Sequence, residues 1–154
     1  MHTLTSRLRA AFPFVGERAA TEDDLLGFLA DRGVAVIWSR DVDKGLYAIG
    51  KYGGEMIHAI CLSTQLIGWS MLYVLAHEIG HYLLHAPGKT RVGPVAVAGF
   101  QCRKEHREAE TVAALLLLPI PELEAALLSG LHKENEDLAN LIGVRLDARR
   151  RYGE

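Results

Sequence analysis

The feature that most constrains this chain is an apolar segment that carries the pattern H-E-x-x-H. It runs from Trp69 to His85 and contains His77, Glu78 and His81. Residues four apart lie on one face of a helix, one turn from each other. Polar groups beside an apolar core cost free energy unless something coordinates or pairs them. The segment therefore predicts a central buried helix with a metal site on one face.

The spacing of these side chains is that of zinc hydrolases. Two imidazoles one helical turn apart can bind one metal ion, and the neighbouring carboxylate can take a proton from a water on that metal. An accidental match is the alternative, but it would not be expected to fall in the middle of an apolar helix. We therefore predict that His77 and His81 are metal ligands and that Glu78 is the catalytic base. Zn²⁺ is the expected metal, and Mn²⁺ or Fe²⁺ would also suit two histidines and one carboxylate.

A catalytic zinc site usually has three protein ligands, so one more must come from elsewhere in the chain. A second helix is expected over residues 103–118, and its first turns are rich in candidates. Glu108 shares a face with the apolar Val112, so we predict that Glu108 is the third ligand. His106 is the alternative, because imidazole also binds zinc well. Glu110 stays open as a further candidate.

Composition bounds the class of protein. The chain has 154 residues and a net charge of −2. The chain has no excess of positive charge of the kind that nucleic-acid-binding proteins have, so no direct nucleic-acid binding is expected. Cys61 and Cys102 suit a reducing compartment, and no apolar run is long enough to span a membrane. We expect a cytoplasmic protein with an N-terminal segment over 1–20, a domain with the metal site over 21–121 and a helical tail over 122–154 packed on it.

The remaining patterns predict an α+β fold. A helix over 22–32 precedes the strands, and Lys51–Gly54 has the composition of a hairpin turn. We expect a small three-stranded antiparallel sheet packed on helices. Its strands are expected over 34–38, 46–49 and 56–62.

The tail of the chain predicts two short helices, over 135–142 and 145–152, separated at Gly143. We interpret them as a packing or substrate-docking element, because a helix with base-reading polar residues is missing. The connection over 88–101 has no clear periodicity and is expected to border the active site.

Four further side chains lie near the predicted site. His85 follows His81 by four residues and would either support a ligand or end the helix. Tyr73 and Tyr82 flank the motif and would serve in packing or as oxyanion donors. Cys102 precedes the second helix and is either a free thiol or an alternative ligand.

Two segments together resemble the ImmA/IrrE family of metallopeptidases. The first is Ala76–His85, which matches the family's H-E-x-G-H helix. The second is Glu108–Pro119, which matches a helix of the form E-x-E-A-(N/D)-x-F-A-x-x-L-L-x-P. The resemblance covers roughly residues 20–121, and the pair of motifs is much more specific than the first alone.

The chain departs from the family pattern at three positions. His106 stands where the family often has its first Glu, Glu110 where it has Asn or Asp, and Val112 where it has Phe. If the family's third ligand is that first Glu, His106 would complete a centre of three histidines.

The resemblance implies a zincin-like fold and a zinc-dependent peptidase. It also implies a protein substrate, such as a helix-turn-helix transcriptional repressor cleaved during a stress or mobile-element response. The alternative is a metal-binding regulatory module of the same fold with little or no peptidase activity.

Overall fold

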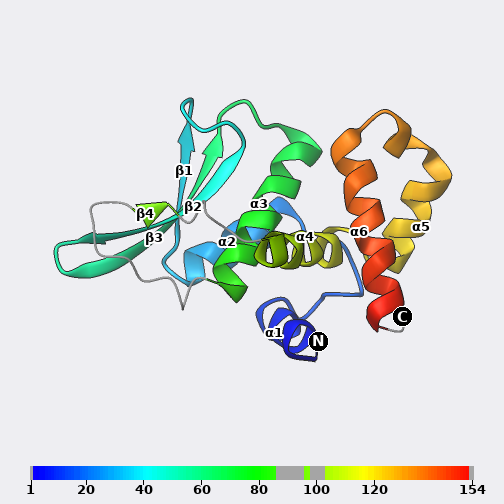
Figure 1. Cartoon of the computed structure of the whole chain (residues 1–154), viewed down its shortest axis with the longest axis horizontal. Coiled ribbons are helices and arrows are strands. Elements are labelled where there is room, and N and C mark those ends of the chain that lie inside the picture. Colours follow the sequence, from blue (N-terminus) through cyan, green and yellow to red (C-terminus); the bar gives the residue numbers. More distant parts are fainter. Residues whose placement is uncertain (1, 86–95, 98–102, 153–154) are drawn as a thin grey trace.

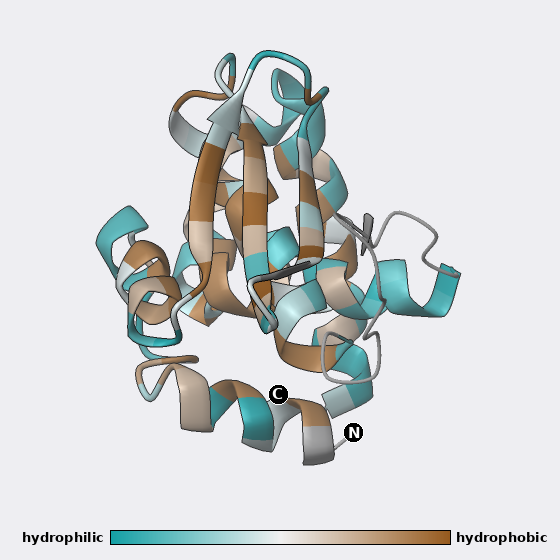
Figure 2. Cartoon of the chain, turned by 90° about the vertical axis from the view of Figure 1, so that its left-hand side faces the viewer, coloured by the Kyte–Doolittle hydropathy of each residue, from teal (hydrophilic) through white to brown (hydrophobic). Residues whose placement is uncertain are grey.

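The computed structural model describes residues 2–85, 96–97 and 103–152 (Figure 1). The fold is α+β, as expected, with a small mixed sheet and most of the helices behind it when the sheet is viewed face-on (Figure 2). A short 3-10 turn lies over Leu131–Lys133. The helices and strands follow in the order α1 (His2–Ala11), α2 (Glu22–Asp31), β1 (Ala35–Ser39), β2 (Gly45–Tyr52), β3 (Glu55–Ser63), α3 (Gly68–Leu84), β4 (Ala96–Val97), α4 (Arg103–Leu117), α5 (Ile120–Ser129) and α6 (Glu136–Tyr152).

The sheet has the strand order β1-β3-β2-β4. As predicted, β2 and β3 form an antiparallel hairpin, with Gly53 and Gly54 at positive φ in its turn. The expectation of an entirely antiparallel sheet was wrong, because β1 pairs with β3 in parallel, in the register Ala35↔Ala59. The strand β1 lies beside β3, on the side away from β2, and it runs in the same direction as β3.

The inner face of the sheet supplies one wall of the core. Tyr47 and Ile49 of β2 are buried, and Ile60 of β3 lies opposite Tyr47. Tyr47 and Ile49 share one face of the sheet, because side chains two residues apart on a strand point to the same side. These side chains pack with Leu75 and Ile79 of α3 in one buried cluster. The helix α3 thus lies between the sheet and α4, and it contacts both.

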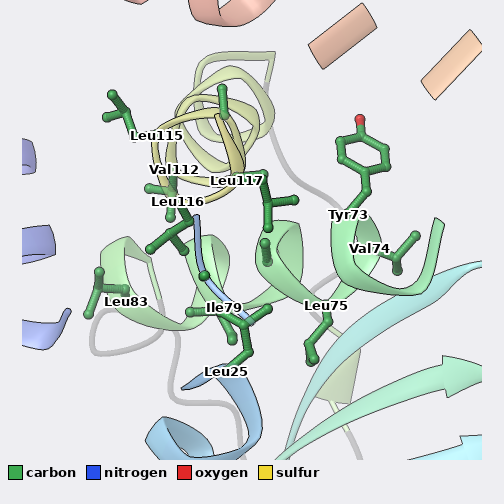
Figure 3. Close-up of a cluster of buried hydrophobic side chains, with 14 of the residues drawn as sticks. Leu25, Tyr73, Val74, Leu75, Ile79, Leu83, Val112, Leu115, Leu116 and Leu117 are labelled. Atoms are coloured by element: carbon green, nitrogen blue, oxygen red, sulfur yellow. The ribbon is translucent and has the colours of Figure 1, made fainter. Parts of the chain in front are cut away.

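The helices α3 and α4 approach each other closely at Gly80. A Cβ atom added to Gly80 would lie 2.9 Å from the Cα atom of Ala109 and 3.1 Å from the Cβ atom of Val112. Real Cβ atoms do not approach backbone this closely, so a glycine is required for this packing. Figure 3 shows the α4 side chains Val112 and Leu116 lying over α3 on this side.

The tail forms one continuous helix, α6, and the prediction of two short helices around Gly143 was wrong. A glycine inside a helix costs roughly 1 kcal/mol relative to alanine. Burial of Leu141 and Ile142 on one side of Gly143, and of Ala148 on the other, offsets this cost. The buried Arg145 also donates from its Nε to the carbonyl oxygen of Leu118, at 2.6 Å, which ties α6 to the end of α4.

Two expectations concern segments that are only partly described. Of the connection over 88–101, the structure describes β4 alone. Cys102 also lies outside the described residues.

Among the described helices, none alone has the length and apolar character needed to cross a membrane. The pair α4 and α5 passes the same criteria only when taken together, and it is bent by 88°.

We predict that Gly80→Ala destabilises the protein by about 1–2 kcal/mol, because overpacking against α4 outweighs the higher helix propensity of alanine. Gly27→Ala is the matched control, since Gly27 is an exposed glycine of α2 with nothing within 4 Å of an added Cβ. The control should gain about 0.5–1 kcal/mol. Urea denaturation measures both, and equal gains in the two variants would contradict the close approach at Gly80.

Candidate metal centre and active site

Three imidazoles meet where α3 and α4 face each other. His77 and His81 are one turn apart on α3, and their Nε2 atoms are 3.1 Å from each other. His106, near the start of α4, joins them, so that one nitrogen from each ring lies within 4.8 Å of the other two. The ring centroids of His77 and His106 are 4.9 Å apart. The structure therefore brings together the two histidines of the motif and the alternative third ligand.

Glu108, the predicted third ligand, lies apart from this group. Its side chain is 35% exposed, and its Oε1 atom is 3.8 Å from the Nε2 atom of His85. His85 in turn places its Nδ1 atom 3.1 Å from that of His81. His85 therefore stands behind His81, in line with one of its two expected roles, and Glu108 stands behind His85.

Glu110 lies beside two of the three histidines. Its Oε1 atom is 3.2 Å from the Nδ1 atom of His77 and 3.5 Å from the Nε2 atom of His106. Tyr73 donates its hydroxyl to the same carboxylate. Burial alone would raise the pKa of Glu110, but the contacts with His77 and Tyr73 outweigh this and hold it below its usual range. Glu110 is therefore a buried carboxylate that stays ionised.

Glu78 points from α3 into the cleft beside the histidines. Its side chain is buried, and its Oε2 atom has no hydrogen-bond partner among the described residues. Burial raises the pKa of Glu78 to about 7, and the nearby His77 offsets this only in part. A carboxyl group that titrates near neutrality can both accept and release a proton at physiological pH.

The cleft that contains these groups lies between β2, α3, α4 and α6. On one side it is lined by residues 44–47 at the start of β2, and on the other by the first turns of α6. From α6 come Glu136, Asp137 and Asn140. More than half of the His106 side chain is exposed, so the histidine group is open to this cleft.

Sequence reasoning missed one residue of the site, Asn140, and the contact between Glu110 and His106. Asn140 of α6 places its Nδ2 atom 3.4 Å from both Glu110 and Tyr73. No local pattern marks Asn140, because α6 reaches the cleft only through tertiary packing. The contact of Glu110 with His106 had a signal, since the two residues are four apart on one helix. Tyr73 serves as a donor to Glu110, in addition to its packing.

The residues present fit a catalytic zinc ion. Three imidazoles form a known donor set for zinc, with the fourth position left to water. His81 is 1% exposed and the adjacent Glu78 is 6% exposed. The Oε2 atom of Glu78 has no hydrogen-bond partner among the described residues, so a cation bound beside it would stabilise this buried carboxylate.

Comparison with known proteins agrees with this geometry. The family model described as the IrrE N-terminal-like domain, a peptidase family, matches residues 43–151. The match includes α3, α4 and α6, and hence every residue of the histidine group. Neither the curated proteins nor the solved structures contain a match to this chain.

The pKa of Glu78 makes the stability of the metal-stripped protein depend on pH. The carboxyl keeps its proton up to about pH 7 in the folded state but releases it near its ordinary value of 4.5 when unfolded. Raising the pH between these values therefore favours unfolding, by up to about 3 kcal/mol. Glu78→Gln should lack this contribution.

Urea denaturation with a chelator at pH 5 and pH 8 measures the effect as a difference between the two proteins. We expect Glu78→Gln to gain stability relative to the parent as the pH rises. The same pH dependence in both proteins would show that Glu78 is not buried as described.

Proposed function

The chain belongs to the peptidase family of the IrrE N-terminal-like domain, and on this premise we propose that it is a zinc-dependent peptidase. One observation carries the proposal. The group formed by His77, His81 and His106 opens into the same cleft as the buried carboxyl of Glu78. This is the arrangement that metal-assisted hydrolysis of an amide bond uses, with a metal position and a proton acceptor side by side.

We assign the roles as follows. His77, His81 and His106 hold the metal, and Glu108 supports His85 from outside the group. When bound, zinc lowers the pKa of a water molecule and polarises the carbonyl group that is attacked. Glu78 takes the proton of the attacking water and delivers it to the leaving amine, for which a pKa near neutrality is suitable.

The start of β2 supports a peptide as the substrate. Among the described residues, β4 pairs only with Ala48 and Ile49 of β2. Gly45–Tyr47 pair with β3 on one side, and they line the cleft. Within the described residues no strand pairs with the other side of this segment. An extended peptide that added there would gain backbone hydrogen bonds while its scissile bond lay beside the histidines.

We further propose that the substrate is a regulatory protein, such as a helix-turn-helix repressor, cleaved in a stress or mobile-element response. The support is the resemblance of the two helical motifs to the ImmA/IrrE family. The open cleft suits a protein segment better than a buried small molecule.

The ligand assignment predicts a clear difference between two residues of α4. Loss of a group that only orients a metal ligand weakens metal binding roughly 10–100-fold. His106→Ala removes a ligand itself, so it should weaken zinc binding by more than this. Glu108→Ala should have the smaller effect, because Glu108 reaches the metal position only through His85. Competition with a chromophoric chelator measures both affinities. The reverse order would assign the third ligand to Glu108.

The peptidase proposal predicts cleavage of a defined protein. The zinc-loaded chain is incubated with a helix-turn-helix repressor encoded beside its own gene, and products are identified by mass spectrometry. We expect cleavage at one or a few bonds, and none with zinc-loaded Glu78→Gln. Cleavage by that variant would contradict the role of Glu78. Intact repressor with a zinc-loaded parent chain would favour the metal-binding regulatory module.

A further inference from the structure

We propose that Glu110 is a positioning residue, held by Tyr73 and Asn140, that fixes the rings of His77 and His106 for metal binding. This inference rests on the proposed metal site. It gives α6 a direct part in that site, through Asn140.

The first step is the orientation of His77. Its Nε2 atom faces the Nε2 atom of His81 at 3.1 Å, and its Nδ1 atom lies 3.2 Å from the Oε1 atom of Glu110. Nδ1 has no formed hydrogen bond in the described structure, and Glu110 supplies the carboxylate oxygen beside it, so a turn of the ring would point a proton on Nδ1 at that oxygen. The lone pair of Nε2 is then left for the metal. Carboxylates that accept from a ligand histidine in this way fix its tautomer and make it a stronger donor.

The second step is that the same carboxylate oxygen reaches His106. The Oε1 atom of Glu110 is 3.5 Å from the Nε2 atom of His106, one turn earlier on α4. A single oxygen therefore contacts one ligand from each of the two helices. Moving Glu110 would disturb His77 and His106 together.

The third step is that the carboxylate itself is held in place. Tyr73 of α3 donates its hydroxyl to Glu110, with distances of 2.6 Å to Oε1 and 2.7 Å to Oε2. Figure 3 shows the Tyr73 side chain pointing to the opposite side of α3 from Leu75. The Nδ2 atom of Asn140 is 3.4 Å from Oε2 and 3.4 Å from the Tyr73 hydroxyl. Three helices thus fix one carboxylate whose side chain is only 8% exposed.

The test is the zinc affinity of Glu110→Gln, measured by competition with a chelator, with Glu136→Gln as the control. Glutamine keeps the shape of Glu110 but not its charge. Glu136 is a carboxylate of the same cleft that contacts none of the three histidines in the described structure. We expect Glu110→Gln to bind zinc about 10–100-fold more weakly and the control to bind as the parent does. Circular dichroism of the metal-free proteins checks that each is folded.

Tyr73→Phe and Asn140→Ala test how the carboxylate is held. Each should weaken zinc binding by less than Glu110→Gln does. If Tyr73 acts through Glu110, adding Tyr73→Phe to Glu110→Gln should cause little further loss, because residues of one network are not additive. These two variants also carry the test if Glu110→Gln does not fold.

Three outcomes would overturn the proposal. One is unchanged zinc affinity in folded Glu110→Gln. Another is full additivity of the Tyr73 and Glu110 substitutions. The third is loss of the visible absorption spectrum of bound Co²⁺ in Glu110→Gln but not in His106→Ala, which would make Glu110 a ligand. Failure of the parent chain to bind zinc at all would instead contradict the proposed function.

Discussion

The close approach of α3 to α4 at Gly80 determines the geometry of the whole site. With no side chain at Gly80, the backbone of Ala109 lies directly against α3. A helix is rigid over one turn. The contact at Ala109 therefore also fixes the positions of His106, one turn earlier, and of Glu110, the next residue. It places His106 and Glu110 beside His77. The metal position is thus a consequence of how tightly two buried helices pack.

The half of the site on α3 could be predicted from the sequence, because its geometry is local. His77, Glu78 and His81 lie within one turn of one helix, and helical spacing alone places them. The half on α4 depends on how that helix is rotated about its axis. Residues 112–117 of α4 are all buried, so the apolar pattern does not single out one face. The shared face with Val112 therefore gave Glu108 no advantage over its neighbours.

The other differences between expectation and structure also arise from tertiary packing. Alternation and turn composition predicted the β2–β3 hairpin, but nothing local specifies which edge of that hairpin β1 joins. Gly143 suggested a break, because glycine weakens a helix. The segment is nevertheless one continuous helix, because α6 residues on both sides of Gly143 are buried against the rest of the protein. For the same reason Asn140, a residue in no motif, lies in the cleft.

Two of the three departures from the family pattern on α4, at His106 and Glu110, make sense as a pair. The pattern E-x-E-A-(N/D) has an acid where this chain has His106, and Asn or Asp where it has Glu110. His106 with Asn at the second position would leave no carboxylate beside the Nδ1 atom of His77.

The chain instead places the buried carboxylate of Glu110 behind the proposed ligands His77 and His106. Three neutral imidazoles leave more positive charge at the metal position than two imidazoles and a carboxylate would. Glu110 returns part of the negative charge through His77, whose donor strength rises when its other nitrogen faces a carboxylate. Tyr73 and Asn140 are then needed, because a carboxylate that acts through a ligand must be held as firmly as the ligand itself.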